Sequence, residues 1–390
     1  MKRLIFANAL LVTPTGTAPG ALVVENGRIA ELLATPSPRA HGERSLDLGG
    51  DYLLPGLVDV HTDSLERQFT PRHGVYWPSP LSAAMANDAL LFGCGVTTAL
   101  DSICAEAFPE EETRRRMFND CVAAVTRGEK EGLFRSRHLL HLRCETADPK
   151  TAAILGDHLS NGLTALASLM DHTPGQRQYR DVRKFREYYA DEGWSDEEFA
   201  RVVERLRDEQ ARYAGVQRAR IVAQCRALGV PLASHDDATA EHVRQAADEG
   251  VAICEFPTTL EAARAARAAG MEVVMGAPNI VLGGSHSGNV SAMEVFRAGL
   301  LTALSSDYAP ASLALAPFLI HQSEGVPLHE CAALATANPA RMLGLDDRGT
   351  LAPGKLADLI RVRLTDGGPV VTGTWVGGAA GIRGVNGHRA

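Results

Sequence analysis

The order of hydrophobic and polar positions divides the 390-residue chain into two kinds of segment. Residues 1–52 contain short runs in which apolar and polar side chains alternate, such as LIFANALLV and ALVVENGRIAELL, and Gly, Pro and Asn separate the runs. This pattern is typical of β-strands joined by turns. Residues 345–390 repeat it in GTLAPGKLADLIRVRL and PVVTGTWVGG. We therefore expect both ends of the chain to form one small β-sandwich domain.

Residues 53–344 follow a different pattern, in which short continuous apolar runs alternate with helical segments. Continuous hydrophobicity indicates strands that are buried on both faces, as in a parallel sheet covered by helices. The runs expected to be strands are 54–61, 96–101, 138–145, 164–171, 230–235, 251–256, 272–276 and 301–306. Eight strands alternating with helices predict an α/β fold of the (β/α)₈ barrel type.

Residues 177–228 exceed what a minimal barrel needs. The segment is highly charged, and apolar residues recur in it at helical spacing: Phe185, Tyr188, Tyr189, Phe199, Val202, Val203 and Leu206. We expect a helical insertion after the fourth barrel strand. Two interpretations of it remain open: a solvated helical hairpin, or a lid or subunit contact that carries arginines toward the mouth of the barrel.

Charge and composition exclude several classes of function. The net charge of −8 makes general binding to nucleic acid or to an anionic membrane surface a poor hypothesis. No stretch approaches the about 18 uncharged apolar residues of a membrane-spanning helix, and the N-terminus shows no convincing signal-peptide cleavage site, so we expect a cytoplasmic protein. The seven cysteines are scattered without a C-x-x-C pair, which indicates reduced thiols rather than disulfides or a structural zinc site.

The segment LLPGLVDVHTDSLE, residues 53–66, carries the clearest candidate chemistry. Alternate side chains of a strand share a face, so His61 and Asp63 should point the same way. At the carboxyl end of the first barrel strand, an imidazole and a carboxylate could bind one divalent cation. An H-x-D pair alone has little specificity, and a structural role is also open.

Several longer motifs, in this order, resemble the amidohydrolase superfamily across residues 50–360: HTDSLERQFTPRHGVYWP, SLMDHTPGQRQYR, GAPNIVLGGSHSGNVSA, SSDYAP and LATANPARMLGL. The resemblance implies a metal-dependent barrel hydrolase, in which Asp63 replaces the second histidine of the superfamily's H-x-H pair. It is closest to a branch that hydrolyses the 5-triphosphate of a ribose phosphonate and releases pyrophosphate. Two rivals stay open: a hydrolase of C–N bonds (cyclic amidase, deaminase or N-deacetylase) and a barrel that has lost catalysis.

The resemblance also implies one or two divalent ions, with zinc expected first and manganese or iron as alternatives. Many members bridge two metals with a carbamylated lysine on strand four, but residues 164–171 contain no lysine. The replacement expected is the carboxylate of Glu145, which could instead form a salt bridge with Arg143. Strand six lacks the superfamily's usual histidine, and His172 or Glu255 could compensate.

Three further residues complete the metal site that the resemblance implies. His172 and His235 stand at the ends of the fourth and fifth predicted strands, where each could also be an ordinary polar residue. Asp307 closes the last strand, where the superfamily uses an aspartate to bind metal and to accept a proton from water. The alternative for Asp307 is a capping role at the following helix.

Features that suit phosphate complete the set of candidate residues. The loop GGSHSGN offers backbone N–H groups of Gly283, Gly284, Ser285 and Ser287 that could hold phosphate oxygens, although it could also be merely flexible. His286 in this loop could contact substrate or donate a proton. The arginines near predicted strand ends, whose guanidinium groups suit phosphates, are Arg67, Arg72, Arg143, Arg177 and Arg180.

The expected partner is therefore a small phosphorylated ribose phosphonate, and neither nucleic acid nor a membrane. Assembly into a homo-oligomer is left open by the sequence.

Overall fold

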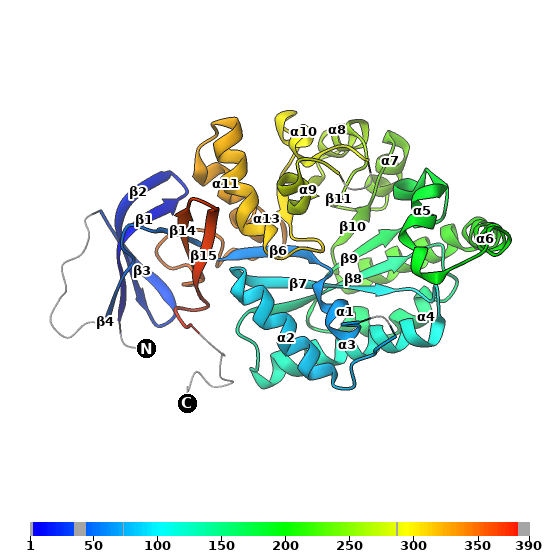
Figure 1. Cartoon of the computed structure of the whole chain (residues 1–390), viewed down its shortest axis with the longest axis horizontal. Helices are drawn as coiled ribbons and strands as arrows, with labels where there is room; N and C mark the ends of the chain where they lie inside the picture. Colours follow the sequence, from blue (N-terminus) through cyan, green and yellow to red (C-terminus); the bar gives the residue numbers. More distant parts are fainter. Residues whose placement is uncertain (1–2, 35–43, 73, 286–287, 381–390) are drawn as a thin grey trace.

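A computed structural model describes residues 3–34, 44–72, 74–285 and 288–380. In Figure 1 a barrel surrounded by helices lies beside a smaller sheet that contains strands from both ends of the chain. None of the helices within these residues is long and apolar enough to cross a membrane.

The expected (β/α)₈ barrel is confirmed. Its eight strands, counted in the described residues, follow each other in sequence order and pair in parallel. They are β6 (Leu57–Thr62), β7 (Val96–Ala105), β8 (Arg137–Glu145), β9 (Thr164–Met170), β10 (Leu232–His235), β11 (Ile253–Glu255), β12 (Glu272–Gly276) and β13 (Ala303–Ser305). The ring closes after β13, where the Asp307 amide donates to the carbonyl of His61 at 2.9 Å and the Asp63 amide to that of Asp307 at 2.8 Å.

A ring of apolar side chains fills the barrel and forms the floor beneath the strand ends. Its buried members are Val60, Leu100, Leu166, Ala233, Ile253, Val274 and Ala303. They come from seven of the eight strands, and partly buried Leu139 of β8 packs against them. Layers of this kind make a barrel interior a packed core, so polar side chains collect at the carboxyl ends of the strands.

Helices cover the outside of the barrel and its ends. Those of α type are α1 (Ser64–Phe69), α2 (Pro80–Gly93), α3 (Glu111–Glu131), α4 (Thr151–Leu155), α5 (Val182–Tyr188), α6 (Asp196–Leu228), α7 (Ala240–Asp248), α8 (Leu260–Ala268), α9 (Ala277–Leu282), α10 (Ala292–Arg297), α11 (Ser312–Glu324), α12 (Leu328–Ala333) and α13 (Ala337–Met342). Short 3₁₀ helices are η1 (His158–Ser160), η2 (Arg177–Tyr179) and η3 (Ala190–Glu192). The alanine-rich α8 buries one face, and the Thr259 side chain caps its first turn.

The strands near both ends of the chain hydrogen-bond into one seven-stranded sheet in the order β15-β14-β5-β1-β2-β3, with β4 also on β1. They are β1 (Leu4–Thr13), β2 (Gly16–Glu25), β3 (Arg28–Leu33), β4 (Arg44–Asp47), β5 (Tyr52–Pro55), β14 (Leu359–Thr365) and β15 (Gly368–Trp375). The sheet has a separate apolar core, in which the rings of Phe6 and Trp375 meet edge to face at 4.9 Å.

One expected strand, residues 54–61, divides between the two sheets at Gly56. The segment before it is β5, which pairs with β1 and β14, and the segment after it is β6 of the barrel. A Cβ atom at Gly56 would lie 2.2 Å from the Oγ1 atom of Thr97, so only glycine lets the chain pass here. This glycine joins the small sheet directly to the first barrel strand.

The segment expected as a helical insertion contains η2, α5, η3 and the long helix α6, which lies at one edge of the molecule in Figure 1. The side chain of Ser195 and that of Glu198 cap each other's backbone at the start of α6. Aromatic rings pack together between α5 and α6: Phe185 lies 4.7 Å from Tyr189 and 6.3 Å from Phe199 between ring centroids. The insertion therefore has an aromatic core of its own.

A buried ion-pair network lies at the start of β8, at the opposite end of the barrel from the strand termini that carry the site. The His138 ring contacts Asp101 at 2.7 Å through Nδ1 and Asp88 at 3.4 Å through Nε2. Burial lowers the pKa of His138, but these two carboxylates outweigh burial and raise the pKa to about 10. The ring is therefore charged at neutral pH and ties β8 to β7 and α2.

Candidate active site

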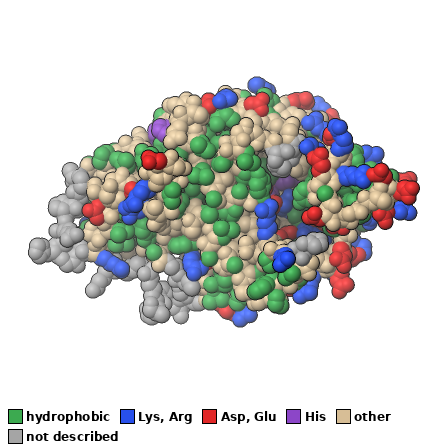
Figure 2. All heavy atoms as spheres, viewed as in Figure 1, with side chains coloured by type: hydrophobic (Ala, Val, Ile, Leu, Met, Phe, Trp, Pro, Cys, Tyr) green, Lys and Arg blue, Asp and Glu red, His purple; other side chains and the backbone are tan. Residues whose placement is uncertain are grey.

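A cleft of about 520 Å³ opens at the carboxyl ends of the barrel strands. In Figure 2 this face of the molecule is hollowed right of centre, where basic and histidine side chains come into view. This is the end at which barrel enzymes carry their active sites. The polar residues that line the cleft include His61, Asp63, Arg67, Glu106, Arg143, His172, His235, Asp236, Asn279 and Asp307.

The first group of possible metal ligands is His61, Asp63 and Asp307. The Nε2 atom of His61 lies 3.3 Å from Asp63 Oδ1, and that same oxygen accepts a 2.9 Å hydrogen bond from Arg143. Burial raises the pKa of Asp63, but Arg143 and His61 outweigh it and hold the pKa below its usual value. Burial lowers the pKa of His61, but Glu255 and Asp63 raise it overall to about 10. Carboxylates on both sides of the ring thus attract positive charge to this position.

Asp307 stands at the point where the last barrel strand returns to the first. Its φ of 53° is in the left-handed region, which is costly for a residue other than glycine and concentrates at functional sites. A Cβ on Gly276 would lie 3.3 Å from the Asp307 carboxylate, so the glycine leaves room for it. Burial, with the nearby Asp63 carboxylate, raises the pKa of Asp307 above its usual value. The helix that follows begins at Ser312 without a side-chain cap, which argues against the capping role.

The second group is His172, His235 and Asp236. The Oδ2 atom of Asp236 lies 3.5 Å from Nε2 of His172 and 3.5 Å from Nε2 of His235. Asp236 follows β10 with φ at 56°, and this left-handed backbone turns its carboxylate toward both rings. Our sequence prediction did not include Asp236 among the ligands. The only signal for it is the acidic pair that follows His235.

Glu145, the expected bridging carboxylate, lies on the other side of His172. Its Oε2 atom is 3.0 Å from Nδ1 of His172, and the carboxylate also accepts from the His172 backbone amide at 3.2 Å. It is absent from the three ligand groups found among the described residues. In this structure Glu145 contacts the nitrogen of His172 that faces away from Asp236.

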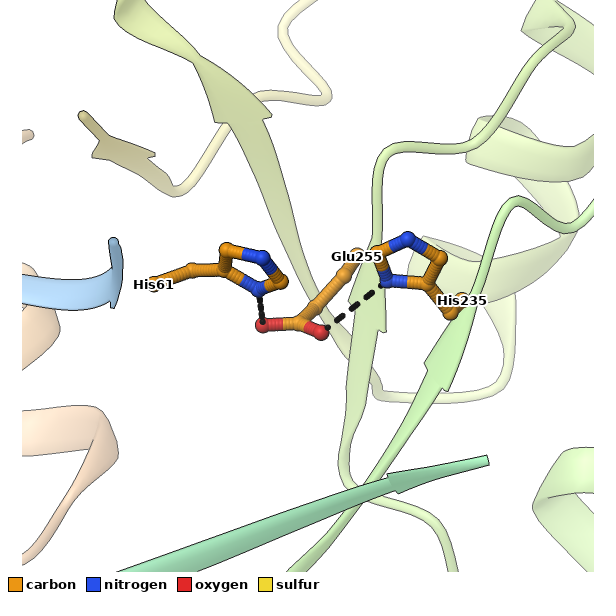
Figure 3. Close-up of side chains that lie close together, drawn as sticks. All are labelled: His61, His235 and Glu255. Atoms are coloured by element: carbon orange, nitrogen blue, oxygen red, sulfur yellow. Dashed lines mark hydrogen bonds and ion pairs between the residues drawn. The ribbon is translucent and has the colours of Figure 1, made fainter. Parts of the chain in front are cut away.

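The third group joins the first two and is drawn in Figure 3: His61, His235 and Glu255. Glu255 Oε1 lies 3.2 Å from Nδ1 of His61, and Oε2 lies 3.4 Å from Nδ1 of His235. Glu255 has no exposed surface. Although burial raises its pKa, the neighbouring His141 and His61 rings hold the pKa well below its usual value, so Glu255 is a carboxylate.

Two buried atoms test whether these side chains suit a cation. Nε2 of His61 and Oδ2 of Asp236 have charged neighbours at 3.3 and 3.5 Å, but neither forms a hydrogen bond within the described residues. A buried polar atom without a hydrogen bond is costly and calls for an explanation. Imidazole nitrogens and carboxylate oxygens are the donors that zinc, manganese and iron share. The residues present therefore fit one or two divalent cations.

The five arginines predicted to bind phosphate differ in their positions relative to the cleft. Arg67 and Arg143 line the cleft. Arg177 is buried, forms an ion pair with Asp237 and donates to the His235 carbonyl, so it holds the end of β10 in place. The other two, Arg72 and Arg180, are exposed and are not among the residues that line the cleft.

The predicted phosphate loop follows α9. Gly284 and Ser285 line the cleft, whereas Gly283, with φ at 75°, ends the helix in the left-handed conformation. His286 and Ser287 lie outside the described residues, so their predicted roles remain predictions.

Three tyrosines of the insertion also line the cleft: Tyr179, Tyr188 and Tyr189. Helical spacing marked the last two as apolar positions of the insertion but did not reveal that they face the site. Burial raises the pKa of Tyr179 well above its usual value, so its hydroxyl keeps its proton. These residues form an aromatic wall on one side of the cleft, whereas one interpretation of the insertion had placed arginines there.

Known proteins resemble this chain in sequence and in fold. The Amidohydrolase family matches residues 182–380. Alpha-D-ribose 1-methylphosphonate 5-triphosphate diphosphatase of Escherichia coli (strain K12) is 42% identical over 366 residues, which are 93% of this chain and 96% of the relative. Imidazolonepropionase of Hyphomonas neptunium is 25% identical over 411 residues, at 92% and 93% coverage. The β-aspartyl dipeptidase of Fervidobacterium islandicum-AW-1 shares the fold with a TM-score of 0.65 at 15% identity, covering 100% of this chain and 98% of that one.

Proposed function

The chain belongs to the amidohydrolase family, and we propose that it is a metal-dependent hydrolase that cleaves alpha-D-ribose 1-methylphosphonate 5-triphosphate to the 5-phosphate and pyrophosphate. The observation that carries this proposal is the identity to the Escherichia coli diphosphatase across nearly the whole chain. It favours a phosphoric anhydride over the C–N bond that the sequence also allowed. The enzyme would thus act in phosphonate catabolism.

The metal shell we propose joins the first two ligand groups. Its members are His61, Asp63, His172, His235, Asp236 and Asp307. Asp236 takes the place that the sequence suggested for Glu145, because its oxygen faces the Nε2 atoms of two histidines, whereas Glu145 contacts Nδ1 of His172. A divalent ion in this shell would acidify water and offset negative charge on the phosphates.

The remaining chemistry falls to side chains of the cleft. Hydrolysis forms a bond from a water oxygen to phosphorus, breaks the anhydride P–O bond and removes a proton from the water. Asp307 is the proposed proton acceptor, because its carboxylate lies in the cleft beside His61 and Asp63 of the proposed shell, where it can take a proton from water. Arg67 lies at the rim, with its guanidinium 5.8 Å from the centre of the Tyr308 ring, and can bind phosphate oxygens.

Product analysis tests this function. Metal-loaded enzyme is incubated with the ribose phosphonate triphosphate and, as a control, with ATP, and pyrophosphate and orthophosphate are measured separately. We expect pyrophosphate from the first substrate with a higher kcat/KM than from ATP. Release of orthophosphate, or hydrolysis only of cyclic amides and N-acetyl compounds, would overturn the proposal. Zinc as the metal, a cytoplasmic location and a homo-oligomer stay predictions.

A further inference from the structure

We propose that Glu255 is a positioning residue that orients His61 and His235 at once, so that both rings present Nε2 to the cleft. The inference rests on the metal site of the proposed function. Glu255 stands on the strand where the superfamily usually has a histidine ligand, and the sequence left open whether Glu255 replaces that ligand. The geometry points to a supporting role for it instead.

The two oxygens of one carboxylate divide between the two rings. Oε1 of Glu255 lies 3.2 Å from Nδ1 of His61, and Oε2 lies 3.4 Å from Nδ1 of His235 (Figure 3). The other nitrogen of each ring faces an acid of the proposed shell: Nε2 of His61 is 3.3 Å from Asp63, and Nε2 of His235 is 3.5 Å from Asp236. Each histidine is thus held between Glu255 and a proposed ligand.

The Nε2 and Nδ1 sides of the His61 and His235 rings lie at different depths in the barrel. His61, His235 and the acids at their Nε2 atoms line the cleft, whereas Glu255 does not and has no exposed surface. Its neighbour on β11, Ile253, belongs to the apolar floor of the barrel. A metal that meets substrate must lie on the cleft side, so Glu255 supports the histidines from below.

The backbone fixes Glu255 in this place. Glu255 pairs with His235 in the register of β10 and β11, and its carbonyl accepts from the Asp236 amide at 2.9 Å. The next residue, Phe256, has φ at 52° and turns its ring toward both histidines, at 5.0 Å from His61 and 5.2 Å from His235 between centroids. Both rings are therefore held by a hydrogen-bond acceptor and an aromatic contact.

A carboxylate behind a metal-binding histidine has a defined effect. It accepts the Nδ1 proton, which leaves the lone pair of Nε2 for the metal and makes the ring a stronger ligand. Loss of such a partner typically weakens metal binding by about 10–100-fold. Because one carboxylate serves both rings here, its loss should weaken both ends of the metal site together.

The test is the Glu255→Gln variant. Glutamine has one acceptor oxygen and one donor nitrogen, so it can support the required tautomer of only one of the two histidines. Glu272→Gln is the control, since Glu272 forms ion pairs with Arg267 and Arg341 away from the cleft. Zinc affinity is measured by chelator competition, and zinc content at saturation by elemental analysis.

We expect the zinc affinity of Glu255→Gln to fall about 10–100-fold, while its zinc content at saturation stays at the wild-type value. The Glu272→Gln control should match the wild type in zinc affinity. Loss of one zinc equivalent at saturation would show that Glu255 is a direct ligand and would overturn the inference. An unchanged affinity would overturn it as well.

A crystal structure of the zinc-loaded wild type gives a test that needs no variant to fold. We expect Nε2 of His61 and His235 on zinc, with Glu255 at their Nδ1 atoms. A zinc–Glu255 bond, or coordination through Nδ1, would contradict the inference. If zinc binds in this way but pyrophosphate is not released from the triphosphate, the proposed function fails and the role of Glu255 stands.

Discussion

The Asp307→Asn variant distinguishes a catalytic role of the Asp307 carboxylate from a purely structural one. Asparagine has the same shape and tolerates the left-handed φ of 53° well, so the backbone turn should persist. What is lost is the carboxylate that accepts a proton. General-base catalysis typically contributes about 10²–10⁴-fold, which corresponds to roughly 3–5 kcal/mol at about 1.36 kcal/mol per tenfold. We expect kcat to fall by that factor while the melting temperature stays close to that of the wild type.

The assay is steady-state pyrophosphate release with zinc content measured on the same samples. Asp88→Asn is a matched control, because Asp88 is a buried acid at the opposite end of the barrel, where it pairs with Arg135 and His138. This control should lower stability and leave kcat per folded, zinc-loaded molecule unchanged. Near-wild-type turnover in Asp307→Asn would refute the role of Asp307 as the proton acceptor. Loss of zinc in proportion to the loss of activity would reduce its role to that of a ligand.

Three further predictions follow from the same structure. Since β9 carries no lysine, activity should not change when bicarbonate is removed during metal loading. If activity is lost without bicarbonate and returns when bicarbonate is added, a carbamylated lysine is present after all. Arg67→Ala should raise KM for the triphosphate about tenfold, as expected for loss of a charged hydrogen bond. Arg180 is not among the residues that line the cleft, so Arg180→Ala should leave KM unchanged. Equal effects of the two substitutions on KM would count against a contact between Arg67 and the substrate. The His138 pKa of about 10 exceeds the unfolded value of about 6.5, so the stability it contributes is full below about pH 6.5 and declines as pH rises toward 10. Urea denaturation of wild type and His138→Gln across this range checks the sign, and a difference that grows with pH would contradict it.

The barrel was predictable from the sequence because its strands are buried on both faces and interrupted by helices at regular intervals. In β12, for example, Val273, Val274 and Met275 are all buried, which a continuous apolar run indicates directly. The division at Gly56 was not predictable, because β5 and β6 are both apolar and only their pairing partners differ. A steric contact between Gly56 and Thr97, distant in sequence, decides where one sheet ends and the other begins.

The candidate site shows the same limit. Strand-end positions were enough to bring His61, His172, His235 and Asp307 to one cleft, since parallel strands of a barrel end on one face. Spacing could not reveal the left-handed backbone that turns Asp236 inward.

Which arginines face the substrate was also beyond a sequence pattern. Arg177 stands near a strand end, as Arg67 does, but it is buried in an ion pair with Asp237. The side-chain partner, which the sequence order does not show, decides whether such an arginine is structural or binds phosphate.

The most direct test of metal-dependent anhydride hydrolysis is a titration of the metal-depleted enzyme with zinc, in which pyrophosphate release from the ribose phosphonate triphosphate is followed at each step. We predict no release without metal, and a rise in rate that saturates when the site formed by His61, Asp63, His172, His235, Asp236 and Asp307 is filled. Undiminished pyrophosphate release from the metal-free enzyme, or orthophosphate as the product of the zinc-loaded enzyme, would contradict it.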